Sequence, residues 1–147
     1  MMVLSIHHVC LVVRDRSIAE KFYCDALGLK RHHTVSSWLV LNSTSTLHLV
    51  EIPEAASMGE DLYREVQHFA LQIDSLREVL RILLERGHVP FQMDMSGRER
   101  EVHSSEDPLD FGLGTLFVRD PDSNLVEFIE EGHGIFQRSM RPNAATS

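Results

Sequence analysis

Two stretches of the chain share one order of hydrophobic and polar positions. Each begins with a run rich in β-branched and aliphatic residues, which predicts a strand, and continues with apolar residues at helical spacing. The first strand is expected within IHHVCLVV, residues 6–13, and the following helix ends at Gly28. The second is expected within VQHFALQI, residues 66–73, and its helix ends at Gly87. A strand–helix unit is therefore repeated.

The two predicted helices share a start signal. Ser17 with Glu20, and Ser75 with Glu78, match the capping box, in which a hydroxyl and a carboxylate satisfy free backbone N–H groups. Extended segments follow each helix, at residues 30–35, 38–42 and 46–52 in the first repeat and at 90–93, 114–120 and 125–131 in the second. This order predicts an α+β fold of two βαβββ modules. The polar connection from Met95 to Gly112 is expected to be a loop, either a substrate cover or a tolerated insertion.

Length and charge narrow the class of protein. A chain of 147 residues fits one domain, so we expect residues 1–136 to form it from modules 4–54 and 64–131, with a loosely ordered tail at 137–147. The net charge of -8 argues against a nucleic-acid partner, and no apolar run approaches a membrane span. Cys10 and Cys24 make no disulfide framework, which favours the cytoplasm. A small molecule remains the expected partner.

Strand alternation groups the polar residues that could carry chemistry. His8 shares a strand face with Cys10, while His7 is expected to point the other way. In the second repeat His68 has the matching position, and the last strand places Glu127 between Val126 and Phe128. His48 lies in the middle of the last strand of the first repeat. Each repeat thus offers one polar side chain on its first strand and one on its last.

These side chains suit a metal ion. Two imidazoles and a carboxylate bind Fe(II), Mn, Zn, Ni or Co and leave positions open for substrate. Any single histidine among the nine in the chain is more often a core or surface residue. The match across the repeat favours a metal site of His8, His68 and Glu127, with His48 as a further candidate.

The segments HHVCLVV…FYCDALGL, LHLVE, QHFALQI and FVRDPDSNLVEFIE together resemble the vicinal oxygen chelate superfamily, also called the glyoxalase/bleomycin-resistance/dioxygenase superfamily. The resemblance implies a curled mixed sheet around a divalent metal, a homodimer, and His8, His68 and Glu127 at metal positions. The turn 120–124 matches the Asp-Pro-Asp-Gly-Asn turn of the family, with Ser123 in place of Gly.

The fourth metal position departs from the family pattern. Glyoxalase I and related epimerases usually have Glu or Gln where this chain has His48. His48 could bind the metal, act as a base beside it, or lie outside the site, while Glu51 has the wrong parity unless a bulge intervenes. Extradiol dioxygenases and fosfomycin thiol transferases of the superfamily need only two histidines and one glutamate.

The superfamily mechanism implies a metal that stabilises a substrate oxyanion and a nearby base, for which His48 and Glu127 are the candidates. Trp38, Thr115 and Phe117 would line the substrate cavity if their parity holds, or would be ordinary sheet packing. Arg119 could meet an anionic group or be structural.

Several functions remain open at this point. The first is a glyoxalase-like (lactoylglutathione lyase-like) isomerase or lyase acting on a small oxygen-bearing substrate. The alternatives are an extradiol-type dioxygenase, an antibiotic-binding protein without metal chemistry, and a thiol transferase.

Overall fold

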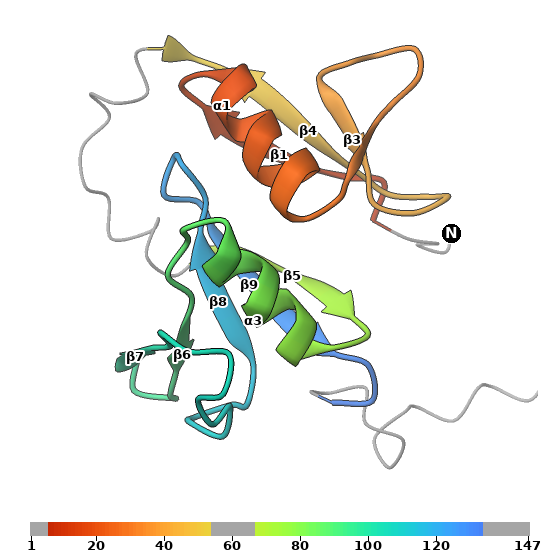
Figure 1. Cartoon of the computed structure of the whole chain (residues 1–147). Helices are drawn as coiled ribbons and strands as arrows, with labels where there is room; N and C mark the ends of the chain where they lie inside the picture. Colours follow the sequence, from red (N-terminus) through yellow and green to blue (C-terminus); the bar gives the residue numbers. More distant parts are fainter. Residues whose placement is uncertain (1–5, 54–66, 134–147) are drawn as a thin grey trace, which may run out of the picture. The chain divides into compact units, whose positions relative to one another are not determined.

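A computed structural model describes residues 6–53 and 67–133, which form two mixed sheets with helices (Figure 1). The first sheet has the order β1-β4-β3-β2 and the second the order β5-β9-β8-β6-β7. Neither sheet closes into a barrel, and the predicted α+β fold of two βαβββ modules is confirmed. Within the described ranges, no helix combines the length and apolar character needed to cross a bilayer.

By their contacts the described residues divide into two compact units. Of the described residues, the first unit comprises 6–53, 67–69 and Arg119–Leu125, and the second comprises Ala70–Val118 and 126–133. The predicted tail at 137–147 lies outside the described residues.

The first unit follows the order β1 (His8–Val13), α1 (Arg16–Glu20), η1 (Lys21–Ala26), β2 (Lys30–Arg31), β3 (Trp38–Val40) and β4 (Thr46–Glu51). Strand β1 pairs in parallel with β4, which pairs antiparallel with β3. One side of this sheet is mainly apolar, because Leu11, Val13, Leu39, Leu47 and Leu49 are buried on it. Helix α1 packs against β4. The alternate residues face outward on the opposite side, which we call the open face.

The first helix starts two residues earlier than the capping box predicts. Asp15, rather than Ser17, is the N-cap, and its carboxylate accepts a hydrogen bond of 3.1 Å from the Ile18 N–H. Glu20 has another role, since Arg31 donates to its Oε2 from Nε and Nη2 at 2.9 and 2.7 Å. This buried carboxylate ties the helix to β2. The second half of the helix, η1, has π-helical hydrogen bonds.

The second unit contains β5 (His68–Ile73), whose first two residues belong to the first unit, then α3 (Leu76–Glu85), β6 (Phe91–Met93), β7 (Glu99–Glu101), β8 (Leu116–Arg119) and β9 (Leu125–Glu130). Ser75 caps α3 as expected, accepting from the Glu78 N–H at 3.2 Å. Glu78 does not complete the box, because its carboxylate pairs with Arg81 at 2.6 Å.

The connection between β6 and β8 is more ordered than a loop. It contains β7, which pairs antiparallel with β6, so the expected uninterrupted loop from Met95 to Gly112 is wrong. The fully buried Gln92 accounts for this order, because its Oε1 accepts from Arg100 Nη2 at 2.7 Å and from the Phe111 N–H at 3.2 Å. Its Nε2 donates to the Thr115 carbonyl at 3.0 Å. A single buried amide thus contacts both β7 and the segment that leads into β8.

The turn at 119–125 is held inside the first unit by a buried carboxylate. Tyr23 donates its hydroxyl to Asp120 Oδ2 at 2.8 Å, and both side chains are buried. Asn124 Nδ2 donates to the same oxygen at 2.9 Å, and the N–H groups of Asp122 and Asn124 donate to Oδ1 at 2.9 and 2.8 Å. Burial raises the pKa of Tyr23 well above its ordinary value, and the negative charge of Asp120 adds to the rise. The hydroxyl therefore remains a donor.

Arg14 adds a second anchor to this turn. Its backbone N–H and its Nε both donate to Asp122 Oδ1 at 2.9 Å, and Nη2 donates to the Pro121 carbonyl at 2.9 Å. Ser123, which replaces the family's glycine, has a φ of 66°, a conformation unfavourable for a residue with a Cβ. The expectation of a less relaxed turn agrees with this angle.

We predict that Tyr23→Phe lowers the free energy of unfolding by about 2 kcal/mol, because a buried carboxylate loses one donor without any change in packing. Urea unfolding monitored by circular dichroism measures this change. The cost should shrink when Tyr23→Phe is made on top of Asp120→Ala, which removes the acceptor. Equal midpoints for Tyr23→Phe and the wild type would contradict the role of the hydrogen bond.

Gly112 provides a second test of the fold. Its φ is +61°, and a Cβ at this position would collide with the carbonyl group of Met93 in β6. Gly97 has a φ of +81° but open space around it. We therefore predict that Gly112→Ala costs about 3 kcal/mol or more in stability, while the matched Gly97→Ala costs about 1 kcal/mol from the backbone conformation alone. Thermal melts compare the two, and similar losses would show that the close approach to β6 carries no weight.

Candidate functional site

Three aromatic or imidazole side chains meet on the open face of the first sheet. The register places Trp38 of β3 opposite His48 of β4, and His48 beside Cys10 of β1. The Trp38 ring stacks on His48 with centroids 4.6 Å apart and contacts His8 at 4.8 Å. The centroids of the His8 and His48 rings are 6.2 Å apart. Strand alternation therefore brings the two predicted histidines of the first repeat to one place.

The histidine before β1 joins this group, contrary to expectation. His7 Nδ1 lies 3.0 Å from His8 Nδ1, and its ring centroid is 5.9 Å from that of Trp38. The prediction that His7 points away from His8 is wrong, because β1 begins at His8 and strand alternation does not extend to the preceding residue.

Glu51 is engaged elsewhere. Its Oε2 accepts a hydrogen bond of 2.8 Å from the Arg16 N–H at the start of α1. The pairing of β1 with β4 runs without interruption to the partners Val13 and Glu51, so no bulge brings Glu51 to the face of His48. His48 and Glu51 were the two candidates for the fourth metal position, and only His48 lies on the face that carries His8.

The remaining predicted residues lie on other strands. His68 is exposed at the start of β5, and Glu127 is 7% exposed in the middle of β9. Phe117 is buried and stacks on Phe91 with centroids 5.7 Å apart, and Arg119 is half-buried at the end of β8. Over residues 6–53 and 67–133, no three His, Cys, Asp or Glu side chains are grouped as metal ligands. His8, His48 and His68 belong to the first unit and Glu127 to the second.

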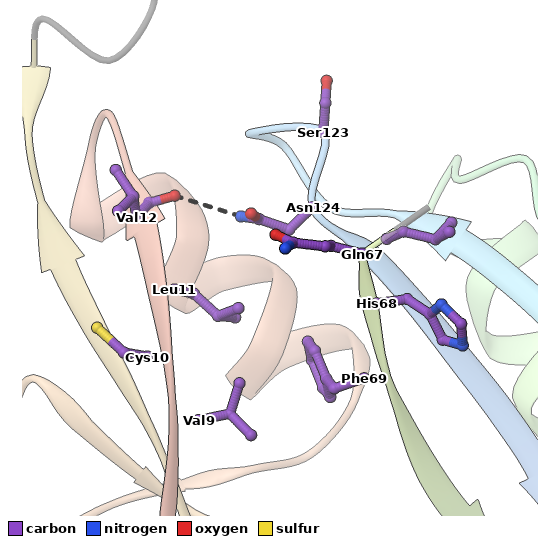
Figure 2. Close-up of a pocket in the computed structure, with 10 residues that line it drawn as sticks. Val9, Cys10, Leu11, Val12, Gln67, His68, Phe69, Ser123 and Asn124 are labelled. Carbon is purple, nitrogen blue, oxygen red and sulfur yellow. Dashed lines mark hydrogen bonds between the residues drawn. The ribbon is translucent and has the colours of Figure 1, made fainter. Parts of the chain in front are cut away.

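A pocket of about 420 Å³ lies along the outer edge of β1, within the first unit (Figure 2). His68 and Gln67 line it together with Asn124, whose Nδ2 donates to the Val12 carbonyl at 3.3 Å. In Figure 2 the Cys10 side chain points to the opposite side of β1 from Val9 and Leu11. Of the lining residues His68, Gln67 and Asn124, the sequence predicted a role for His68 alone. Asn124 belongs to the turn that matches the family motif, and this match could have pointed to it.

The fold agrees with a comparison of the sequence with protein families. Residues 5–128 match the family model described as the Glyoxalase/Bleomycin resistance protein/Dioxygenase superfamily. The chain belongs to this superfamily. A search of curated proteins finds no match.

Solved structures with a similar fold have names that describe different functions. Glyoxalase I of Leishmania major, described as trypanothione-dependent, is 20% identical with a TM-score of 0.59, over 94% of this chain and 90% of that one. TnmS3, an antibiotic-binding protein from Streptomyces sp., is 18% identical with a TM-score of 0.57, over 88% and 98%. The oxidase ChaP-H2 is 13% identical with a TM-score of 0.57, over 90% and 98%. These likenesses show the fold.

Thr115 offers a test of how the interior tolerates a polar group. Its Oγ1 is buried and has no hydrogen-bond partner among the described residues. We predict that Thr115→Val raises the free energy of unfolding by about 1 kcal/mol, because the substitution removes an unsatisfied hydroxyl at nearly constant volume. Thr44→Val is the control, since the Thr44 hydroxyl is exposed and donates to Asn42 Oδ1 at 3.1 Å. Chemical denaturation measures both, and a destabilised Thr115→Val would contradict the prediction.

Proposed function

We propose that this chain is a divalent-metal-dependent enzyme, a glyoxalase-like isomerase or lyase that acts on a small oxygen-bearing substrate. The observation that carries the proposal is the pairing of His8 and His48 on the open face of the first sheet. Superfamily membership supports it, since superfamily members commonly use divalent metals. His8, His68 and Glu127 are proposed as metal ligands, and His48 as a fourth ligand or as the base.

The donor atoms of the first unit fit such an ion. Within the described ranges His48 makes ring contacts but no hydrogen bond, and His8 uses only Nδ1, toward His7. An imidazole nitrogen of each side chain is therefore left for coordination. Neutral imidazole is suited to Zn, Ni, Co, Mn or Fe(II), and a carboxylate such as Glu127 completes a set that leaves positions open.

A bound metal would supply positive charge that stabilises a negative charge developing on a substrate oxygen. The side chains would do the remaining work. His48 and Glu127 are the candidates to take a proton from a substrate carbon and return it, because imidazole and carboxylate side chains commonly act as general bases. Trp38 holds His48 by stacking and offers its flat ring to a substrate, while Thr115, Phe117 and Arg119 are proposed as further substrate contacts.

A second candidate is an extradiol-type dioxygenase. The stacking of His48 on Trp38 is compatible with a His48 that does not bind the metal. The ligands would then be His8, His68 and Glu127, and two histidines with one carboxylate are a set used for Fe(II) and oxygen. Oxygen uptake in the presence of Fe(II) distinguishes this activity from isomerisation. Thiol-dependent turnover would indicate a transferase, and binding of an antibiotic without any metal would indicate a binding protein.

Two further expectations accompany the proposal. A homodimer is expected from the superfamily, and sedimentation velocity tests it. A cytoplasmic location is expected because Cys10 and Cys24 are both free thiols, which a reducing compartment preserves.

The proposal predicts near-stoichiometric metal in protein purified without chelator. His8→Ala, His68→Ala and Glu127→Ala should each lose most of this metal, because each removes a ligand. Elemental analysis measures the content per chain. His33→Ala is the matched control, since it removes an exposed imidazole from the same unit.

His48→Ala separates the two roles of that residue. Loss of metal equal to that of His8→Ala makes it a ligand, whereas retained metal with lost turnover makes it the base. Wild-type protein without metal under any condition of reconstitution would overturn the proposed function.

A further inference from the structure

The position of His7 is fixed by the neighbouring strand although its side chain is exposed. Its carbonyl accepts a hydrogen bond of 3.0 Å from the Thr46 N–H at the start of β4. The preceding carbonyl, that of Ile6, accepts from Ser45 Oγ at 2.6 Å. The His7 ring also meets Trp38 edge-on. Contacts with Trp38 of β3 and with Thr46 at the start of β4 therefore hold His7 beside His8.

The atoms of this contact restrict the tautomer of His8. A hydrogen bond between two Nδ1 atoms needs one donor and one acceptor. If His8 donates, its proton lies on Nδ1 and its Nε2 is left with a free lone pair. If His7 donates, the neutral His8 carries its proton on Nε2, which then cannot coordinate. Only the first arrangement leaves His8 able to bind a metal through Nε2.

We propose that His7 is a positioning residue that accepts the Nδ1 proton of His8 and so presents His8 Nε2 as the metal-binding atom. This inference rests on the proposed function. A histidine ligand commonly donates its second ring N–H to a carboxylate, a backbone carbonyl or water, and this partner fixes the tautomer and raises the basicity of the ligand. Here an adjacent imidazole has that role. The open face thus contains its own orienting group, supplied by the residue just before the strand.

The test uses the full chain and three variants. His7→Phe keeps an aromatic ring beside Trp38 but removes the acceptor. His7→Asn restores an acceptor, because its amide oxygen can occupy the place of Nδ1. His33→Phe removes an exposed imidazole elsewhere in the first unit and serves as the control. Ring nitrogen chemical shifts, measured by NMR without metal, report the tautomer of His8. Calorimetric titration with Zn²⁺ alone reports affinity.

We expect His8 in the wild type to carry its proton on Nδ1, and His7→Phe to lose this preference and to bind Zn²⁺ about 10- to 100-fold more weakly. His7→Asn should recover most of the affinity, and His33→Phe should match the wild type. An unchanged tautomer and affinity in His7→Phe would overturn the positioning role while the metal site stands. Equal losses in His7→Phe and His7→Asn would show that the imidazole itself is required, which also overturns it. If the wild type binds no Zn²⁺, the proposed function fails, and this inference fails with it.

Discussion

The Asp120 carboxylate receives four hydrogen bonds inside the first unit, from Tyr23, from the Asn124 side chain and from two backbone N–H groups. A charge that is removed from water is costly unless all of its acceptor positions are satisfied, and this turn satisfies them with neighbouring groups. The turn joins β8 to β9, so the same bonds hold the chain where it enters the strand that carries Glu127. The Asp120 contacts therefore fix the turn from which β9 begins.

Alternation along the strands is the part of this molecule that follows most directly from its sequence. Leu47 and Leu49 are buried and His48 lies between them on the other face, because a side-chain period of two leaves no other arrangement once one face packs on a helix. The order of elements, the end of each helix and the Ser75 cap could also be predicted, because they depend on residues close together in the sequence. The pairing partners of the strands and their register could not be predicted from the sequence, because contacts between residues far apart in the chain determine them.

Three predictions made from the hydrophobic and polar pattern of the sequence differ from the structure, each for a reason that this pattern does not contain. Asp15 competes with Ser17 as a cap, and both residue types are good caps, so only the geometry of the chain leaving β1 decides between them. His7 escaped the parity argument because the strand starts one residue later. Strand β7 has the polar composition of a loop and is ordered by Gln92, a buried amide with partners far along the sequence. The metal ligands remain predictions.

The assignment of Arg119–Leu125 to the first unit means that the repeats of the sequence do not coincide with the compact units of the structure. A fragment ending after β4 would leave the Tyr23 hydroxyl and the Arg14 guanidinium without the carboxylates that they meet in the whole chain. The first repeat is therefore not self-sufficient, because it depends on a segment that the chain supplies from within the second repeat.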